Sequence, residues 1–146
     1  EVLLMPFNGG HTSGDLVVYD IISKTLFAGD LVFNERAASI PHADIPTWLK
    51  HLNSLEAQDW DLLVPGHGPI ISMSQALDST RSYLKFLLTT AANAISKGES
   101  LAEVMTTDIP APFNKLAHVE REFLRSMTTL FRQMEDEQFD LSPASN

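Results

Sequence analysis

The first 68 residues alternate between short apolar runs and turn residues, which is the pattern of β-strands. The runs lie at 2–7, 16–22, 25–28 and 62–64, and a Pro-Gly pair ends the last of them. Only two residues separate the second run from the third. We therefore expect these two strands to be neighbours joined by a tight turn.

Between the third and fourth runs the pattern changes to helical spacing. Asp44 is in position to cap a helix, Pro46 lies in its first turn, and the following apolar residues predict one buried face. These apolar residues are Ile45, Trp48, Leu49, Leu52 and Leu55. Strands interrupted by a helix in this way predict an α/β fold.

From Ser72 onward the chain is patterned as helices. Ser72 with Gln75, and Ser100 with Glu103, have the spacing of capping boxes, and a last helix is predicted to start near Asn114. The helix after Ser72 has an apolar stripe of Leu77, Thr80, Leu84, Leu87, Ala91 and Ile95. The stripe of the last helix is Leu116, Val119, Phe123, Met127, Leu130 and Met134. We interpret a stripe of this kind as core packing rather than a cofactor site.

The composition is that of a soluble globular domain with one hydrophobic core. The chain has 146 residues, of which 44% are hydrophobic and 20% charged, with a mean hydropathy of -0.03. Its net charge of -9 repels phosphate backbones and anionic lipids, so neither nucleic acid nor a membrane is an expected partner. The absence of cysteine excludes disulfides and thiolate ligands, but it leaves periplasmic and cytoplasmic locations equally open.

Three glycine-rich stretches each carry a side chain that can bind a metal. The side chains are His11, Asp30 and His67, in the segments 9–15, 27–31 and 64–69. A strand before each side chain supplies a rigid base, and the glycines let the backbone turn sharply, so we expect the three to meet at one edge of a sheet. Two imidazoles and a carboxylate suit zinc, which binds nitrogen and oxygen at roughly 2.0–2.2 Å.

Each stretch taken alone has a simpler interpretation. The histidine of a single Gly-His turn is more often a structural residue that hydrogen-bonds the backbone, and an isolated Gly-Asp more often ends a strand or caps a helix. His67, between two glycines and two prolines, is harder to explain by structure alone. Asp15 is interpreted as a turn carboxylate, with a supporting role behind the ligands as the alternative.

In this order, the three stretches resemble the third, fourth and fifth metal-binding motifs of the metallo-β-lactamase fold superfamily, over residues 2 to about 71. The resemblance implies that His11 binds a first metal, that Asp30 bridges two metals and that His67 binds the second. The implied fold is α/β, namely the C-terminal half of an αββα metallo-β-lactamase sandwich with extra C-terminal helices.

The resemblance is incomplete, because the superfamily's principal motif, His-x-His-x-Asp-His, does not occur in this sequence. That motif precedes the Gly-His-Thr turn, and only ten residues come before His11. His42, His51 and His118 provide no substitute, and we expect the last two to be solvated. We therefore expect the chain to be an inactive fragment of a longer enzyme, or to be completed by a separate chain.

The complete site of the superfamily implies a hydrolase. Two zinc ions would lower the pKa of a bridging water, which then attacks an ester, thioester, amide or related bond, with Asp30 orienting that water. The stretches around His11 and Asp30 are most similar to the zinc metallohydrolases associated with quinoprotein relay systems. Glyoxalase II-type thioesterases share the same turns, so the small-molecule substrate stays open. The alternative function is a non-catalytic assembly or binding module that retains the fold.

The remaining expectations concern domain organisation and surfaces. We expect residues 1–71 to carry the sheet and the ligand turns, 72–140 to form the helical C-terminal part of the same domain, and 141–146 to be a tail. His42 is a candidate substrate contact, with an exposed loop histidine as the more common alternative. A fragment of this kind leaves apolar sheet surface uncovered, so a homo-oligomer or strand exchange is expected.

Overall fold

A four-stranded sheet occupies the first half of the chain in the computed structural model, which describes residues 1–72 and 75–141. The strands, in their order across the sheet, are β1 (Val2–Phe7), β2 (Asp15–Asp20), β3 (Thr25–Phe33) and β4 (Leu62–His67). β2 pairs antiparallel with β1 and β3, whereas β3 and β4 are parallel. Two parallel strands need a long crossover, and helix α1 (Ile45–Glu56) supplies it. The predicted α/β class is confirmed.

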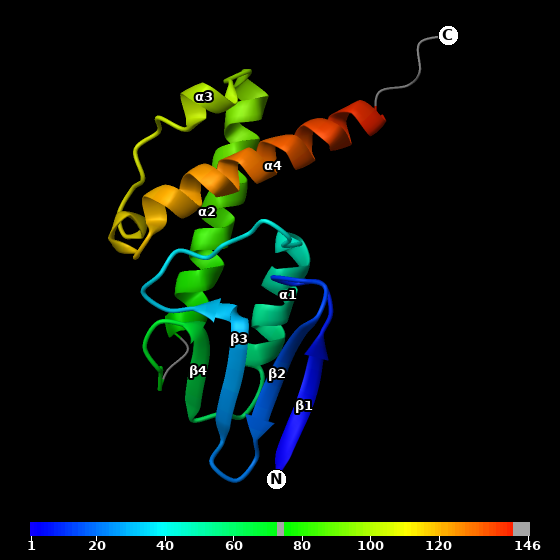
Figure 1. Cartoon of the computed structure of the whole chain (residues 1–146), viewed down its shortest axis with the longest axis vertical. Helices are drawn as coiled ribbons and strands as arrows, with labels where there is room; N and C mark the ends of the chain where they lie inside the picture. Colours follow the sequence, from blue (N-terminus) through cyan, green and yellow to red (C-terminus); the bar gives the residue numbers. More distant parts are fainter. Residues whose placement is uncertain (73–74, 142–146) are drawn as a thin grey trace.

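Helices cover one face of this sheet. α1 and α2 (Gln75–Lys97) both contact β3, and α4 (Val119–Leu141) crosses α2 beyond the end of the sheet (Figure 1). Between α2 and α4 the chain forms the short helices α3 (Leu101–Val104) and η1 (Phe113–Lys115). The buried side chains between these layers include Trp48, Leu52, Leu77, Leu84, Phe123 and Met127. Most members of both predicted helical stripes are therefore core residues, each contributing roughly 1.5–3 kcal/mol through burial.

The cap predictions have different outcomes. Asp44 caps α1 as expected: its carboxylate accepts hydrogen bonds from the Thr47 hydroxyl and amide, which hold the pKa of Asp44 below its usual range. The capping box of Ser100 and Glu103 is also confirmed, at α3. Residues 73–74 of the predicted capping box at 72–75, and residues 142–146 of the predicted tail at 141–146, lie outside the described ranges.

Four predicted boundaries are wrong. β2 ends at Asp20 rather than Ile22, where the chain turns toward β3, and β4 does not end before Pro65 and Gly66 but continues to His67, because its pairing with β3 extends that far. The third wrong boundary is the end of β3. The strand does not end at Ala28 but continues to Phe33, because an irregularity at Gly29, which has φ +54°, lets it keep pairing with β4. Asp30 therefore lies inside a strand rather than after one.

The fourth wrong boundary is the start of the last helix, which is Val119 rather than about Asn114. The cause is a backbone pairing with the segment that follows β3. The Ala37 amide donates to the Ala117 carbonyl, and the Ala117 amide donates to the Glu35 carbonyl. These bonds draw residues 116–118 out of a helical path, so that α4 begins only after them.

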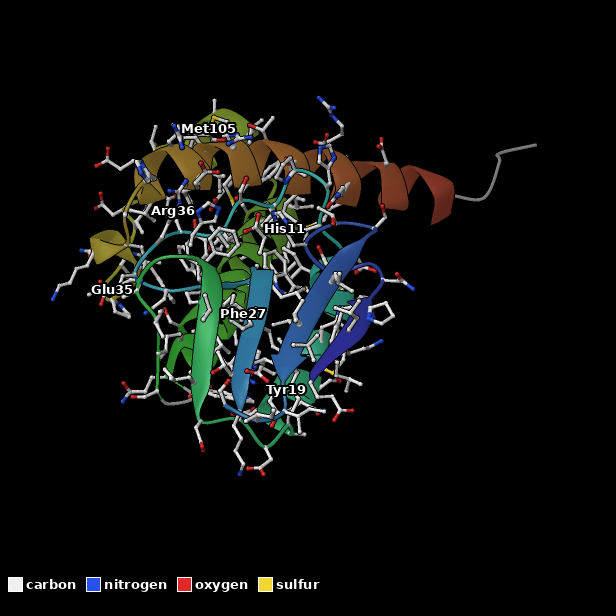
Figure 2. All side chains as sticks on the ribbon, turned by 60° about the horizontal axis from the view of Figure 1, so that its bottom comes forward. His11, Tyr19, Phe27, Glu35, Arg36 and Met105 are labelled. Carbon is white, nitrogen blue, oxygen red and sulfur yellow. The ribbon has the colours of Figure 1, made fainter. Side chains whose placement is uncertain are left out.

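The face of the sheet opposite the helices is apolar and exposed. Leu4, Val18, Phe27 and Val64 are successive register partners, so one apolar row crosses all four strands. Leu4 is 62% exposed and Phe27 44%. Figure 2 shows this outward face in front of the helices, with Phe27 near its centre. Within the described ranges, none of the helices has the length and apolar character that a membrane span requires.

A buried hydroxyl joins α2 to the end of β3. Thr80 is 2% exposed, and its hydroxyl oxygen Oγ1 accepts a hydrogen bond from the Phe33 amide at 3.1 Å, while the hydroxyl donates to the Phe33 carbonyl oxygen at 2.9 Å. A buried amide without a partner is costly, so the Phe33 amide must keep its bond to Thr80. This requirement fixes the position of α2 along β3.

Replacing Thr80 with Val keeps the size but removes the hydroxyl, which leaves the buried Phe33 amide without its partner. We expect Thr80→Val to lower the free energy of unfolding by about 1–3 kcal/mol in urea denaturation. Thr80→Ser keeps the hydroxyl and is the control, with a smaller expected loss. A loss in Thr80→Ser with none in Thr80→Val would show that the methyl group, not the hydrogen bond, matters at this position.

Candidate functional site

Three different elements bring the predicted ligands to the same end of the sheet. His11 lies in the loop from β1 to β2, Asp30 lies within β3, and His67 is the last residue of β4. Figure 2 shows His11 at this end, opposite the end that carries Tyr19. The parallel pairing of β3 and β4 places Phe33 beside His67, so the strand that carries Asp30 also borders the third predicted ligand.

Asp30 lies between the two imidazoles. Its Oδ2 is 3.9 Å from His11 Nδ1, and its Oδ1 is 3.5 Å from His67 Nε2. The side chain of His11 is 15% exposed, whereas those of Asp30 and His67 are 41% and 40% exposed. The carboxylate thus presents one oxygen to each histidine and remains open to solvent on one side.

Glycine at position 66 makes room for this arrangement. A Cβ there would lie 2.1 Å from Asp30 Oδ1 and 2.6 Å from the Gly29 carbonyl carbon. The turn that carries His67 therefore approaches Asp30 more closely than any other residue type permits. Gly10, before His11, is similarly enclosed, since its Cβ would lie 2.8 Å from the Leu31 side chain.

Two imidazoles and a carboxylate in this cradle fit a zinc ion as a donor set. They are not yet arranged as a closed set of ligands. Among residues 1–72 and 75–141, no group of three or more His, Asp or Glu side chains has an arrangement that could hold a metal ion. The three side chains therefore fit a zinc ion by the chemistry of their donor atoms and by the space that Gly66 leaves beside Asp30, but they do not provide a complete set of ligands.

Aromatic rings form the inner wall behind both histidines. The Phe33 ring stacks on His67, with centroids 5.0 Å apart and 26° between the planes. Trp48 meets His11 edge to face at 5.3 Å, and its Nε1 donates to the Leu31 carbonyl oxygen at 2.8 Å. Both aromatic side chains are almost fully buried. The imidazoles consequently rest on a rigid apolar surface that limits their rotation.

The turn that carries His11 is closed by its own hydrogen bonds. The Asp15 carboxylate accepts from the Thr12 hydroxyl at 2.7 Å and from the Thr12 amide at 3.1 Å. The Asp44 amide donates to the Gly10 carbonyl at 3.0 Å, which ties the turn to the start of α1. Asp15 is therefore a turn carboxylate, and the turn that it closes holds His11.

The other histidines are separate from this cluster. His42 is exposed on a turn before α1, and His118 is exposed before α4. The expectation that His51 is solvated is wrong: it is half buried, its Nδ1 is buried without a hydrogen-bond partner, and its ring meets Phe7 edge to face. The reason is that His51 lies on the side of α1 that faces Phe7 of β1 and the turn at Gly10. A Cβ on Gly10 would lie 2.9 Å from His51 Nδ1.

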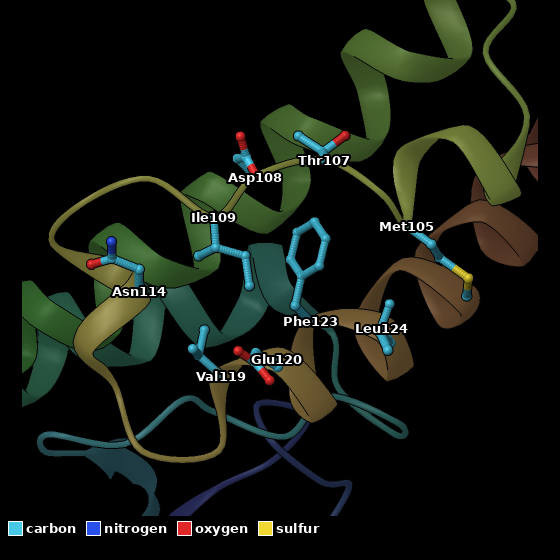
Figure 3. A pocket seen from close by; sticks show the side chains of 9 residues that line it. All are labelled: Met105, Thr107, Asp108, Ile109, Asn114, Val119, Glu120, Phe123 and Leu124. Atoms are coloured by element: carbon cyan, nitrogen blue, oxygen red, sulfur yellow. The ribbon is translucent and has the colours of Figure 1, made fainter.

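A cleft of about 320 Å³ lies elsewhere, between α3, the chain that follows it and α4 (Figure 3). Its floor is apolar, with Ile109, Val119 and Phe123, and Asp108 and Glu120 are among its polar residues. None of the three predicted ligands lines it. This cleft is therefore not the candidate metal site.

Sequence reasoning missed the residues that support the ligands. Thr80 was predicted only as a member of a helical stripe, and no pattern predicted a supporting role for Phe33 or Asn34. Only the pairing of β3 with β4 and the contact of α2 with β3 show that the three act together. Trp48 was found as part of a helical stripe, but its second contact, with His11, is a tertiary one. Gly66 was the one available signal, since a glycine directly before a candidate ligand suggests a close approach of backbone.

Comparisons with known proteins give the same class as the sequence motifs. Residues 2–67 match the sequence model of the metallo-beta-lactamase superfamily. The structure is similar to the metallo-beta-lactamase from Pontibacter korlensis, with 30% identity, a TM-score of 0.51, and coverage of 57% of this chain and 41% of that one. It is also similar to the DIM-1 metallo-beta-lactamase, with 26% identity, a TM-score of 0.52, and coverage of 58% and 42%.

The resemblance predicted from the sequence is thus confirmed: this is part of a metallo-beta-lactamase fold. TMB-1 supports the fold alone, with 24% identity and a TM-score of 0.51 over 58% of this chain and 41% of that one. The chain spans about two fifths of the length of these structures. Among curated proteins, none matches the chain significantly.

Substituting Gly66 tests whether the close approach to Asp30 is required. Gly66→Ala introduces a Cβ that collides with Asp30 Oδ1 and with Gly29, so we expect a loss of about 1–3 kcal/mol in unfolding free energy. Gly14→Ala is the matched control, because a Cβ at Gly14 meets nothing within 4 Å, and its effect should stay within about 1 kcal/mol. Equal stabilities of the two variants in urea denaturation would contradict this packing.

Proposed function

We propose that the chain is part of a zinc-dependent hydrolase in which His11, Asp30 and His67 are metal ligands. The observation that carries the proposal is the position of Asp30, which presents one carboxylate oxygen to each imidazole at 3.9 and 3.5 Å. The class of the matched structures supports it, since the Pontibacter korlensis and DIM-1 proteins are metallo-beta-lactamases. As in the superfamily, we propose two zinc ions in the complete site.

Zinc bound at these residues would supply a Lewis acid that polarises a carbonyl group and lowers the pKa of water. The residues of this chain contribute position. Phe33 and Trp48 hold the planes of the two imidazoles, and Asp15 closes the turn beneath His11. Asp30, whose backbone is held in β3, would orient the attacking water by accepting a hydrogen bond from it.

The site requires more residues than this chain contains. The sequence lacks His-x-His-x-Asp-His, and the chain covers about two fifths of the structures that it matches. We propose that the remaining ligands come from the other half of an αββα sandwich, which would also cover the outward face of the sheet. The chain alone would then be inactive. The substrate class that we propose is an ester, thioester or amide, with the quinoprotein-associated metallohydrolases as the most similar subfamily.

Two further assignments follow from this proposal. Residues 1–71 and 72–140 would form one domain, because α2 is joined to β3 through Thr80 and Phe33. His42 would contact substrate, since it lies in the loop that leaves β3 and returns to the Gly10 turn through the amide of Asp44.

One observation favours the alternative function, a non-catalytic assembly module. The outward face of the sheet is apolar across all four strands, and exposed apolar surface of this kind is typical of interfaces. In a hydrolase, the same face is the contact with the other half of the sandwich. Zinc binding therefore distinguishes the two functions, whereas association alone does not.

Zinc titration tests the hydrolase proposal on the chain itself. We expect the chain to bind zinc, and His67→Ala to weaken the binding by more than about 10-fold, since even residues behind metal ligands change affinity by 10–100-fold. His118→Ala removes an exposed histidine outside the cluster and should leave the affinity unchanged. Calorimetry gives the affinities. Equal affinities for the two variants would overturn the assignment of His67 as a ligand, and the zinc requirement of the complete site is tested separately on a longer product.

A longer gene product that also contains His-x-His-x-Asp-His gives the stricter test. There we expect about two zinc ions by plasma mass spectrometry and hydrolysis of ester or thioester substrates, both lost in His67→Ala. The 146-residue chain assayed alone should hydrolyse neither. Full activity without zinc in the longer product would exclude the mechanism.

The outward face predicts self-association of the chain when it is produced alone. We expect a mass above that of the monomer in light scattering, rising with concentration, and a shift toward monomer in Phe27→Glu. Ile22→Glu is the control, because Ile22 is 81% exposed in the turn after β2 rather than in the apolar row. A monodisperse monomer at every concentration would contradict this use of the face.

A further inference from the structure

We propose that Asn34 is a positioning residue for His67, and that its side chain holds the turn at 65–69 so that the imidazole faces Asp30. The proposal deepens the proposed function, because it assigns a role toward one of the proposed ligands. It rests on contacts of the chain itself, so it can be tested without a metal.

Two hydrogen bonds attach the turn to this one residue. The Asn34 amide donates to the His67 carbonyl oxygen at 2.9 Å, and the Asn34 Nδ2 donates to the Pro69 carbonyl oxygen at 2.9 Å. The two acceptors lie on either side of Gly68. Asn34 therefore holds the turn at His67 through its backbone amide and at Pro69 through its side chain, so only the bond to Pro69 depends on the side chain.

Gly68 shows how closely the turn is pressed onto Asn34. Its φ is +95°, and a Cβ there would lie 1.8 Å from the Asn34 carbonyl oxygen and 2.7 Å from the carbonyl carbon. No other residue type fits this contact without moving the backbone. The turn thus contacts Asn34 at three consecutive residues, from the His67 carbonyl to that of Pro69.

The neighbouring residue fixes the other side of the imidazole. Phe33 stacks on His67 at 5.0 Å, and Thr80 holds the Phe33 backbone from α2. Because Phe33 and Asn34 are consecutive, one short segment sets both the ring plane and the turn. Asp30 lies on the same strand, so the separation between His67 and Asp30 is defined within one rigid unit.

The side-chain bond of Asn34 can be removed with little effect on the core, because the hydrogen bond to Pro69 lies at the surface. Asn34→Ala removes the donor. Asn34→Asp keeps the shape, replaces the donor with an oxygen and adds a negative charge near the proposed cation. A charge effect alone would strengthen zinc binding in Asn34→Asp, whereas loss of position weakens it in both variants.

The experiment compares Asn34→Ala and Asn34→Asp with the unaltered full chain. Asn93→Asp is the control for added charge, since Asn93 is exposed on α2. We expect amide hydrogen exchange at residue 34, whose amide bonds to His67, to accelerate by at least about 10-fold in both variants. Zinc affinity should fall about 10–100-fold, as is typical for residues that orient metal ligands, with melting temperatures close to that of the unaltered chain.

The outcomes separate this proposal from the proposed function. Unchanged exchange at residue 34 and unchanged His67 ring signals in imidazole ¹H–¹⁵N spectra would overturn the positioning role. Altered exchange and ring signals, together with a zinc affinity that His67→Ala leaves unchanged, would support the positioning role and contradict the assignment of His67 as a ligand. Tighter zinc binding in Asn34→Asp, with exchange unaltered, would show a charge effect and also overturn the proposal.

Discussion

The parallel pairing of β3 with β4 is the contact on which the candidate site depends. It brings the Asp30 carboxylate against the backbone of Gly66 and places Phe33 beside His67. The pairing tolerates no side chain at position 66, and α2 supports it from behind through Thr80. A displacement of β3 relative to β4 would therefore change the separation between the Asp30 carboxylate and the His67 imidazole.

Much of this arrangement was predictable from the sequence. Apolar runs and helical stripes indicated the strands and the long helices, because burial of one face imposes a period that is visible in the chain. The three glycine-rich turns indicated the candidate ligands, because a backbone that approaches another segment closely needs a glycine, and here the glycines lie next to the candidate side chains. The end of β3 and the start of α4 were not predictable, since each is set by hydrogen bonds between residues distant in sequence. For α4, these bonds join Ala117 to Glu35 and Ala37.

The supporting residues were hidden for the same reason. Asn34 and Phe33 occupy ordinary positions at the end of an apolar strand, and no local pattern connects them with a turn more than thirty residues later. Their roles depend on register, which is a property of two strands together. The fold class and the candidate ligands can thus be predicted from local sequence patterns, whereas the distances between these side chains depend on strand pairing.

The backbone bonds between residues 35–37 and Ala117 have a consequence for how such a protein can diversify. They fasten the start of α4 to the segment that carries the site, while residues 105–112 between α3 and η1 are not needed for that attachment. Insertions or deletions in that stretch would remodel the wall around Ile109 and Phe123 while the ligands keep their spacing. The fold thus separates a part that is free to vary from the part that must keep its geometry.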